Sequence, residues 1–449
     1  MEQVKIDGVW PLEGFVTQKN AGVGLKMGVI GLGQGGSKIA DAFAGIKNPR
    51  NNQQVYPCMA VNSNLGDMSS LRNIPNRLRF PLKGYEQGVG KNPEIGRQAF
   101  EENGEEIFEA IGELMTGCEL ILVINSMGGG TGTGSVNLLV DAIADFLGIP
   151  AGSITTLPLP NEVESINAYN AMAELVPKLS ELRIDEENRE YRVLESLIVL
   201  DNEKIVREHI EDPEVKGLTW DFYSNYKVAS ILHEWSVLTT LESQLTVDAA
   251  DLMNHILRAG GVITFAKKKI NLEQVTNDDD LLDEIISTYK GKNVLANGFD
   301  YANDMRSMAL VVVMPKKWTH RLNQDTLERI RTKMKGELPD INFYPGSVTH
   351  NSDKHAIVYT MANMAGLPER AKHLREEAEQ LKQLREERER RASGFNMGQK
   401  LETSSRPASR RGPAGAGANP FAKQTAAASE SQSPARTPLK PYNPFGKNK

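Results

Sequence analysis

The chain has 449 residues, with 52 Lys and Arg against 58 Asp and Glu, a formal net charge of −6 and 40% hydrophobic residues. This composition is that of a globular protein long enough for two to three domains. No apolar run reaches the roughly 18 to 20 residues of a membrane span, and the first residues lack the pattern of a secretory leader. Cys58 and Cys118 are too few for a disulfide framework or a structural zinc site, so we expect a reducing, cytoplasmic location.

The charge is divided unevenly along the chain. Residues 392–449 contain nine Lys and Arg against two Asp and Glu, a balance of +7, which leaves −13 for residues 1–391. The same segment has too few apolar residues to offset the entropy of ordering. We therefore expect a basic, disordered tail at 392–449.

Apolar strands alternate with helix-length segments from Met27 onward. After a first strand at Met27, we expect strands at 55–61, 120–124, 153–157 and 197–200. This alternation predicts an α/β fold with a doubly wound, mainly parallel sheet.

The remaining segments define the expected parts of the chain. Residues 1–26 form an N-terminal extension that packs loosely, and 27–219 form the first α/β domain. Residues 220–252 form a connecting helix and a loop, and 253–366 form a second, smaller α/β domain. Residues 367–391 precede the tail as a charged helix, whose apolar stripe contacts either its own body or a neighbouring subunit.

The first glycine turn follows the first strand. Gly31-Leu32-Gly33-Gln34-Gly35-Gly36 fits G-x-G-x-x-G between a strand and a helix, which is the setting of a dinucleotide site. A nicotinamide site also requires an acidic residue at the end of the second strand, where Asn62 stands instead and Asp67 lies too far into the loop. The turn is therefore either a phosphate site or a tight connection.

A second glycine loop follows the strand at 120–124. Five of its seven residues are glycine, in the order Gly128, Gly129, Gly130, Thr131, Gly132, Thr133 and Gly134. Without bulky side chains, successive backbone N–H groups can converge on phosphate oxygens at the start of the next helix. The chain has no G-x-x-x-x-G-K-[ST] motif, which excludes a P-loop. Two glycine loops on neighbouring strands would grip a di- or triphosphate from both sides.

The G-G-G-T-G-T-G loop resembles the signature of the tubulin/FtsZ superfamily, and further segments follow in the family's order over roughly 27–366. Residues 88–97, with Asn92, are similar to the loop that senses the γ-phosphate. The loop at 158–164 corresponds to the ribose loop, with Glu162 or Glu164 on the ribose. In 197–204, Asn202 corresponds to the residue that reads guanine. The resemblance implies a GTPase that uses GTP and Mg²⁺ and couples hydrolysis to polymerisation, with 27–219 as the nucleotide-binding domain.

The connecting helix carries the remaining base residues of the resemblance. Asn225 falls on the family's base-binding Asn, and Phe222, one turn earlier, could stack on the purine. Many bacterial relatives have Asp where this chain has Tyr226, whose hydroxyl accepts one hydrogen bond from guanine but not two. Guanine preference therefore rests on the resemblance, and surface polarity of the helix is the alternative.

The loop after the connecting helix carries two carboxylates. Thr246-Val247-Asp248-Ala249-Ala250-Asp251 is similar to the family's N-x-D-x-x-D/E, with Thr in place of Asn. The resemblance implies that Asp248 and Asp251 orient a water on the nucleotide of the next subunit. Helix capping alone would also explain both residues.

Three functional hypotheses remain. The extension, charged helix and basic tail resemble TubZ, the plasmid- and phage-borne branch that moves DNA by filament growth. The residues 92–97 and the second glycine loop resemble FtsZ, which forms the division ring. A dinucleotide-dependent oxidoreductase would use only the first glycine turn. For the first hypothesis we expect a head-to-tail homopolymer whose tail contacts a DNA-bound adaptor at a centromere.

Overall fold

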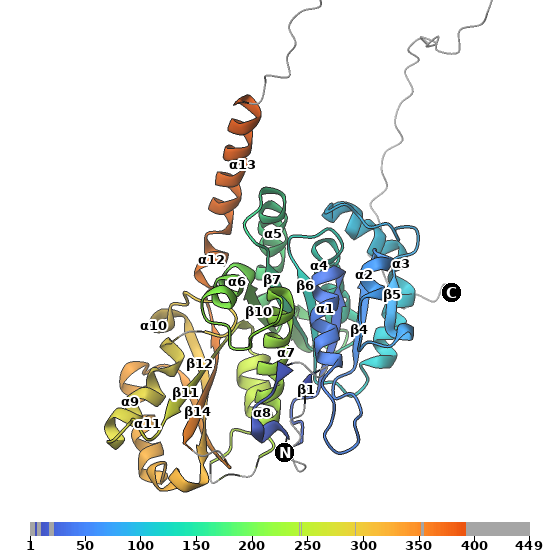
Figure 1. Ribbon diagram of the computed structural model, residues 1–449. Coiled ribbons are helices and arrows are strands. Elements are labelled where there is room, and N and C mark those ends of the chain that lie inside the picture. The colour runs from blue at the N-terminus through green and yellow to red at the C-terminus, as the bar shows by residue number, and fades with distance from the viewer. Residues whose placement is uncertain are drawn as a thin grey trace, which may run out of the picture.

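A ten-stranded sheet runs through the protein in a computed structural model that describes residues 5–6, 10–17, 22–241, 243, 245–291, 293–351 and 354–391 (Figure 1). Its strands, in chain order, are β3 (Met27–Leu32), β4 (Cys58–Asn62), β5 (Arg79–Pro81), β6 (Leu120–Ser126), β7 (Ala151–Leu157), β10 (Ser196–Asp201), β11 (Gly261–Asn271), β12 (Met305–Pro315), β13 (Asn342–His350) and β14 (His355–Met364). Two small ribbons pair β1 (Lys5–Ile6) with β2 (Trp10–Pro11), and β8 (Leu182–Ile184) with β9 (Glu190–Arg192).

Helices cover the sheet and connect its strands. The α-helices are α1 (Gly33–Ala44), α2 (Leu65–Ser69), α3 (Pro93–Leu114), α4 (Thr131–Phe146), α5 (Glu162–Leu175), α6 (Asn202–Glu211), α7 (Trp220–Leu238), α8 (Ala249–Leu252), α9 (Asp278–Ile286), α10 (Tyr301–Asp304), α11 (Gln324–Glu337), α12 (Glu369–Lys372) and α13 (Leu374–Arg391). The short 3₁₀ and π turns are η1 (Gly14–Thr17), η2 (Asn76–Leu78), η3 (Val176–Leu179), η4 (Met253–Leu257), η5 (Ser287–Lys290) and η6 (Lys316–Arg321).

The strand order is β13-β12-β14-β11-β10-β7-β6-β3-β4-β5. Neighbours from β5 to β11 are parallel, and only β14 runs antiparallel to its two neighbours within this sheet. The expected α/β fold with a mainly parallel sheet is confirmed. The strands of the expected second domain continue the same sheet, because β11 pairs with β10 at Ser196 and Leu197.

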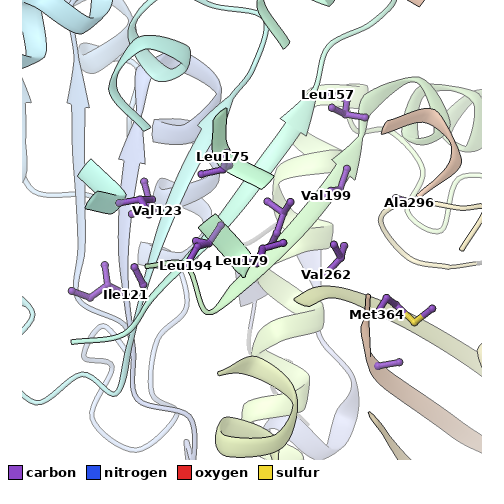
Figure 2. Packing of buried hydrophobic residues seen from close by; sticks show 14 of the residues in the cluster. Ile121, Val123, Leu157, Leu175, Leu179, Leu194, Val199, Val262, Ala296 and Met364 are labelled. Carbon is purple, nitrogen blue, oxygen red and sulfur yellow. The ribbon is translucent and has the colours of Figure 1, made fainter. Parts of the chain in front are cut away.

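Both faces of the central strands are buried, as a parallel sheet requires. In β6, Ile121 and Val123 join one apolar cluster, whereas Leu122 and Ile124 join the cluster on the other face. Figure 2 shows the first cluster, where Val199 of β10 lies among residues from neighbouring strands and helices. The near-continuous apolar runs that predicted these strands reflect this burial on both faces.

The sequence did not predict β13, which lies at the edge of the sheet. Its residues include Pro345 and Gly346, which are unfavourable in a central strand. An edge strand tolerates proline because one side of its backbone needs no partner in the sheet. The position of β13 at the edge therefore explains why a strand forms here against local propensity.

The connecting helix predicted at 220–241 is α7, which crosses the molecule between the two ends of the sheet (Figure 1). Its 19 residues span about 28 Å. Near its first residue, Asp221 pairs with Lys38 of α1 at 3.3 Å. Near its last, the carbonyl of Ser236 accepts a hydrogen bond from the N–H of Gly24, just before β3.

The expectation that residues 1–26 pack loosely is wrong for the described part of this segment. Phe15 is fully buried and packs edge-on against Tyr359 of β14. Glu13 contacts Lys267 of β11 at 2.7 Å, and Lys267 also contacts Glu234 of α7 at 3.0 Å. Long-range contacts with α7 and the sheet therefore fix a segment that has no internal periodicity.

Burial and neighbouring charges oppose one another in the ion pairs around Lys267. Burial lowers the pKa of the Lys267 ammonium, but the carboxylates of Glu234 and Glu13 outweigh it and raise that pKa above its ordinary value. Burial raises the pKa of Glu234, against the effect of Lys267. The hydroxyl of Tyr359 donates at 2.9 Å to Glu234 Oε2, the same oxygen that Lys267 contacts at 3.0 Å.

Lys267→Met should lower the free energy of unfolding by about 3–5 kcal/mol, because it leaves the buried Glu234 carboxylate without its cation. Lys268→Met is the matched control, since Lys268 is the next residue on β11 and pairs with Glu284 at the surface. We expect that variant to stay within about 1 kcal/mol of the wild type. Urea unfolding measures both, and equal losses would contradict the role given to Lys267.

The C-terminal charged helix is α12 followed by α13, which extends beyond the body of the protein (Figure 1). Leu374 and Ala378 are buried, and α13 packs along α5. Leu384, further along the helix, is half exposed. The stripe thus contacts the chain's own body at Leu374 and Ala378, and contact of this helix with a neighbouring subunit stays a prediction. The tail expected at 392–449 lies outside the described residues.

Candidate functional site

The predicted nucleotide residues gather at one edge of the sheet. Strands β4, β3, β6, β7 and β10 are parallel neighbours, so their carboxyl ends meet at this edge. The candidates that end or follow these strands are Asn62, the turn from Gly33 to Gly36, the loop 128–134, the segment 158–164 and Asn202. Ligands of open α/β sheets bind in the crevice at this edge.

The two glycine loops touch one another. Gly33 has φ +68°, and a side chain there would place its Cβ 2.8 Å from the backbone nitrogen of Gly132. Glycine is therefore required for both conformation and space. Helix α4 begins at Thr131, inside the second glycine loop, so the N-termini of α1 and α4 both open at this edge. Their backbone N–H groups and dipoles favour an anion between them.

Side chains fix the second strand against both loops. The amides of Gln34 and Asn62 donate to the Asp67 carboxylate at 3.0 and 3.3 Å. The hydroxyls of Ser63 and Thr131 lie 2.7 Å apart in a hydrogen bond. The sequence places Asp67 too far into the loop to reach the site, but α2 turns the chain back and brings its carboxylate to Gln34 of the glycine turn.

The candidate γ-phosphate loop, residues 88–97, lies against the second glycine loop. Asn92 caps α3, because its side-chain oxygen accepts from the N–H groups of the next turn. A side chain on Gly130 would place its Cβ 2.9 Å from both the backbone nitrogen and the carbonyl oxygen of Asn92. The Asn167 amide donates to the carbonyls of Lys91 at 3.0 Å and Gly128 at 3.3 Å. The candidate γ-phosphate, glycine and ribose segments are thus tied together.

A polar cavity of about 570 Å³ lies beside this junction. Its lining comes from the starts of α3 and α4 and from one face of α5, with residues Lys91, Asn92, Pro93, Glu94, Arg97, Thr133, Gly134, Asn167, Asn170, Ala171 and Glu174. Asn92, Thr133 and Gly134 therefore border both the junction and an open space large enough for a polar ligand.

The two candidate ribose carboxylates point to different partners. Asn161 caps α5, so Glu162 and Glu164 lie in its first helical turn rather than in the loop expected to reach 164. Glu164 pairs with Lys91 and contacts Gly128. Glu162 pairs at 3.2 Å with Arg385 of the C-terminal helix. The structure therefore brings Glu164, and not Glu162, against the glycine loop.

The candidate base residues lie where α6 and α7 begin. The Ser224 hydroxyl donates to the side-chain oxygen of Asn202 at 3.4 Å, which joins the two helices. The rings of Phe222 and Tyr226 stack with centroids 4.3 Å apart, and Asn225 lies beside them, partly exposed. Tyr226, the departure from the family pattern, thus supports an aromatic surface on which a purine could stack.

The aspartate loop lies at the opposite edge of the sheet. Ala249 of α8 contacts Gly24, which precedes β3, whereas Gly33 follows β3. The six residues of β3 separate the two positions by about 20 Å. One chain therefore does not bring Asp248 and Asp251 to the glycine loops.

The two aspartates differ in their contacts. The Asp248 carboxylate accepts from the N–H of Asp251 at 2.7 Å and caps α8, as the capping alternative expected. Burial, and then the nearby Asp251 carboxylate, raises the pKa of Tyr344 in β13. The loop is anchored to β13, where the N–H of Ser347 donates to the carbonyl of Leu245 at 2.8 Å.

Two segments of the chain match known protein families. Residues 26–208 match the GTPase domain of the Tubulin/FtsZ family, and residues 234–375 match the C-terminal domain of the Tubulin/FtsZ-like protein TubZ-like. The chain belongs to the tubulin/FtsZ family. The first tubulin/FtsZ match holds both glycine loops, the ribose carboxylates and Asn202, and the second holds Asp248 and Asp251. The chain is therefore a GTPase, and the hypothesis of a dinucleotide-dependent oxidoreductase is wrong.

Individual members of the tubulin/FtsZ family cover most of the chain. The tubulin-like protein TubZ of Bacillus cereus is 27% identical over 371 residues, which are 78% of this chain and 81% of that protein. TubZ of Bacillus thuringiensis subsp. israelensis is 26% identical over 387 residues, which are 80% and 78% of the two chains. A GTPγS-form protofilament of TubZ from B. thuringiensis serovar israelensis has the same fold, with a TM-score of 0.72 at 24% identity over 84% of this chain and 97% of that chain.

Sequence reasoning missed three contributors to this family site. Lys91 and Asn167 connect loops that are far apart in sequence, and no local pattern marks such a contact. Asp67 was visible as an acidic residue five positions after the second strand, but its approach depends on the turn at α2.

Among the described residues, no helix is both long and apolar enough to cross a bilayer.

Proposed function

We propose that this protein is a filament-forming GTPase of the cytoplasm that segregates plasmid or phage DNA. The observation that carries the proposal is the separation of the two halves of the site. The glycine loops lie at one edge of the sheet and the aspartate loop at the other. A head-to-tail contact between two copies would bring the aspartate loop of one subunit to the nucleotide of the next.

Each loop then has a defined task. Backbone N–H groups from 33–36 and 128–134 bind the phosphates, with Asn92 at the γ-phosphate end. Glu164, the carboxylate that lies against the glycine loop, binds the ribose. Asn202 and Asn225 bind the base, and Phe222 stacks on it. Asp251 of the next subunit orients the attacking water, and Asp248 holds the start of α8. Phosphoryl transfer to water requires mainly such orientation and stabilisation of charge.

The residues present fit a magnesium ion held largely by the nucleotide. Among the described residues, no group of three or more acidic, histidine or cysteine side chains forms a metal cage. Mg²⁺ commonly uses one or two carboxylates together with phosphate oxygens and water. Asp67, which Gln34 and Asn62 hold at the glycine turn, is the carboxylate that would hold the ion. Bound there, Mg²⁺ would neutralise phosphate charge.

The C-terminal match favours DNA segregation over the division ring. It is to the TubZ-like domain, and one structure with a TM-score of 0.65 is described as a type III plasmid segregation TubZ. We propose that residues 392–449, with their balance of +7, couple the filament to a DNA-bound adaptor or to DNA itself. Such an electrostatic contact weakens as salt rises.

Removal of residues 392–449 should leave GTP hydrolysis intact and abolish co-sedimentation with the centromere complex. The reason is that all candidate nucleotide residues precede the tail, whereas the basic charge lies within it. Co-sedimentation of both proteins with GTP measures the difference, and unchanged co-sedimentation of the shortened protein would contradict the role of the tail. Electron microscopy of the full chain with GTP and Mg²⁺ tests filament formation itself.

A further inference from the structure

Arg370 of α12 lies where two neighbouring strands end. Its Nη1 donates to the Asp201 carboxylate and its Nη2 to the carbonyl of Pro158, both at 2.6 Å. Its Nε and Nη2 both contact the Glu377 carboxylate at 3.1 Å. Only 13% of the Arg370 side chain is exposed. The planar guanidinium thus makes directed contacts that a single point charge could not reproduce.

The partners of Arg370 begin the two segments that carry the candidate ribose and base residues. Leu157, the last residue of β7, pairs with Asp201, the last residue of β10. Pro158 then opens the segment that leads to Glu164, and Asp201 directly precedes Asn202. Arg370 therefore connects the start of the candidate ribose segment to the start of the candidate base segment.

Further contacts fix this connection in place. The Asp201 carboxylate also accepts from the N–H of Glu203 at 3.0 Å and so caps α6. On the other side of the guanidinium, Glu377 accepts from the hydroxyl of Ser165 in α5 at 2.7 Å. Burial lowers the pKa of Arg370, but its carboxylate partners raise it overall, so the guanidinium is charged at all working pH values.

We propose that Arg370 is a positioning residue for the ribose and guanine segments, which makes the start of the C-terminal helix part of the nucleotide site. This assignment rests on the proposed function. Arg370 does not itself bind the nucleotide. It holds Pro158 and Asp201 at a fixed separation, and through them the side chains of Glu164 and Asn202. The phosphate loops at 33–36 and 128–134 have no share in these contacts.

Arg370→Gln should weaken GTP binding on the order of tenfold and reduce the preference for GTP over ATP, because the base and ribose residues lose their shared support. Inorganic tripolyphosphate, which can use only the phosphate loops, should bind the variant as it binds the wild type. Arg375→Gln is the matched control. Arg375 lies five residues further along, in α13, is 66% exposed and pairs at 2.9 Å with Glu379 one turn away. The Arg375→Gln variant should bind GTP, ATP and tripolyphosphate with the affinities of the wild type.

Isothermal titration calorimetry with GTP, ATP and tripolyphosphate measures these constants on the full chain. The assignment is overturned if Arg370→Gln keeps wild-type affinity and selectivity for GTP. It is also overturned if GTP and tripolyphosphate weaken by the same factor, because that would indicate general damage to the fold. Failure of the wild type to bind GTP would instead overturn the proposed function on which the assignment rests.

Discussion

Gly130→Val should reduce GTP binding by at least about 100-fold, or roughly 3 kcal/mol, and prevent assembly. A Cβ at this position would lie 2.4 Å from Val89 and 2.9 Å from backbone atoms of Asn92. Backbone atoms cannot move aside as a flexible side chain can, so the start of α4 must separate from the loop that holds Val89 and Asn92. Binding of a fluorescent GTP analogue measures the loss.

Backbone strain is not the reason that Gly130→Val should lose GTP binding. Its φ is −93°, which other residues adopt readily, so crowding and not backbone strain decides the outcome. Gly129→Ala tests contact with the ligand without crowding the protein. In the described part of the chain, no atom beyond the adjacent residues would lie within 4 Å of its Cβ. We expect its thermal melting to match the wild type, so any loss of affinity reports contact with the nucleotide. Near wild-type GTP binding by Gly130→Val would show that this loop does not hold phosphate.

Asp251→Ala should bind GTP and polymerise but hydrolyse GTP about 10²- to 10⁴-fold more slowly, because a carboxylate that positions the water contributes on this scale. The filaments should be over-stable. A small fraction of the variant should also stabilise wild-type filaments, since each variant subunit inactivates the site of its neighbour. Phosphate release and filament sedimentation measure the two effects.

Asp300→Ala is the control for the loss of an acidic residue at the start of a short helix. Asp300 caps α10, a four-residue helix like α8, and belongs to neither edge site. It should hydrolyse GTP at the wild-type rate. Hydrolysis by Asp251→Ala at that same rate would show that Asp251 is not the residue that orients water.

Local sequence patterns predicted the parts of the site that each strand and its following turn determine. The glycine loops at 33–36 and 128–134 and the strands before them follow from periodicity and the absence of side chains. Contacts between distant segments could not be predicted in this way. Phe15 is buried only because Tyr359 lies opposite it, and β13 forms although it contains proline. Arg370 is one of many charged residues in 369–391, and nothing local distinguishes it.

The same limit applies to the two candidate carboxylates at the ribose. Sequence placed Glu162 and Glu164 in one loop and could not separate them. In the structure, Glu162 pairs with Arg385 and Glu164 lies against the glycine loop, because the first turn of α5 directs the two side chains to different sides. Helical geometry decides this division, and it requires knowing that α5 begins at Glu162.

The shared active site is tested most directly by GTP turnover per subunit, measured across a range of protein concentrations. The aspartate and glycine loops lie at opposite edges of one chain. If Asp251 of the next subunit orients the water, as we propose, an isolated subunit lacks that group. We expect turnover per subunit to be close to zero at low concentration and to rise steeply above the threshold for assembly. Turnover per subunit that stays constant across that threshold would contradict the account.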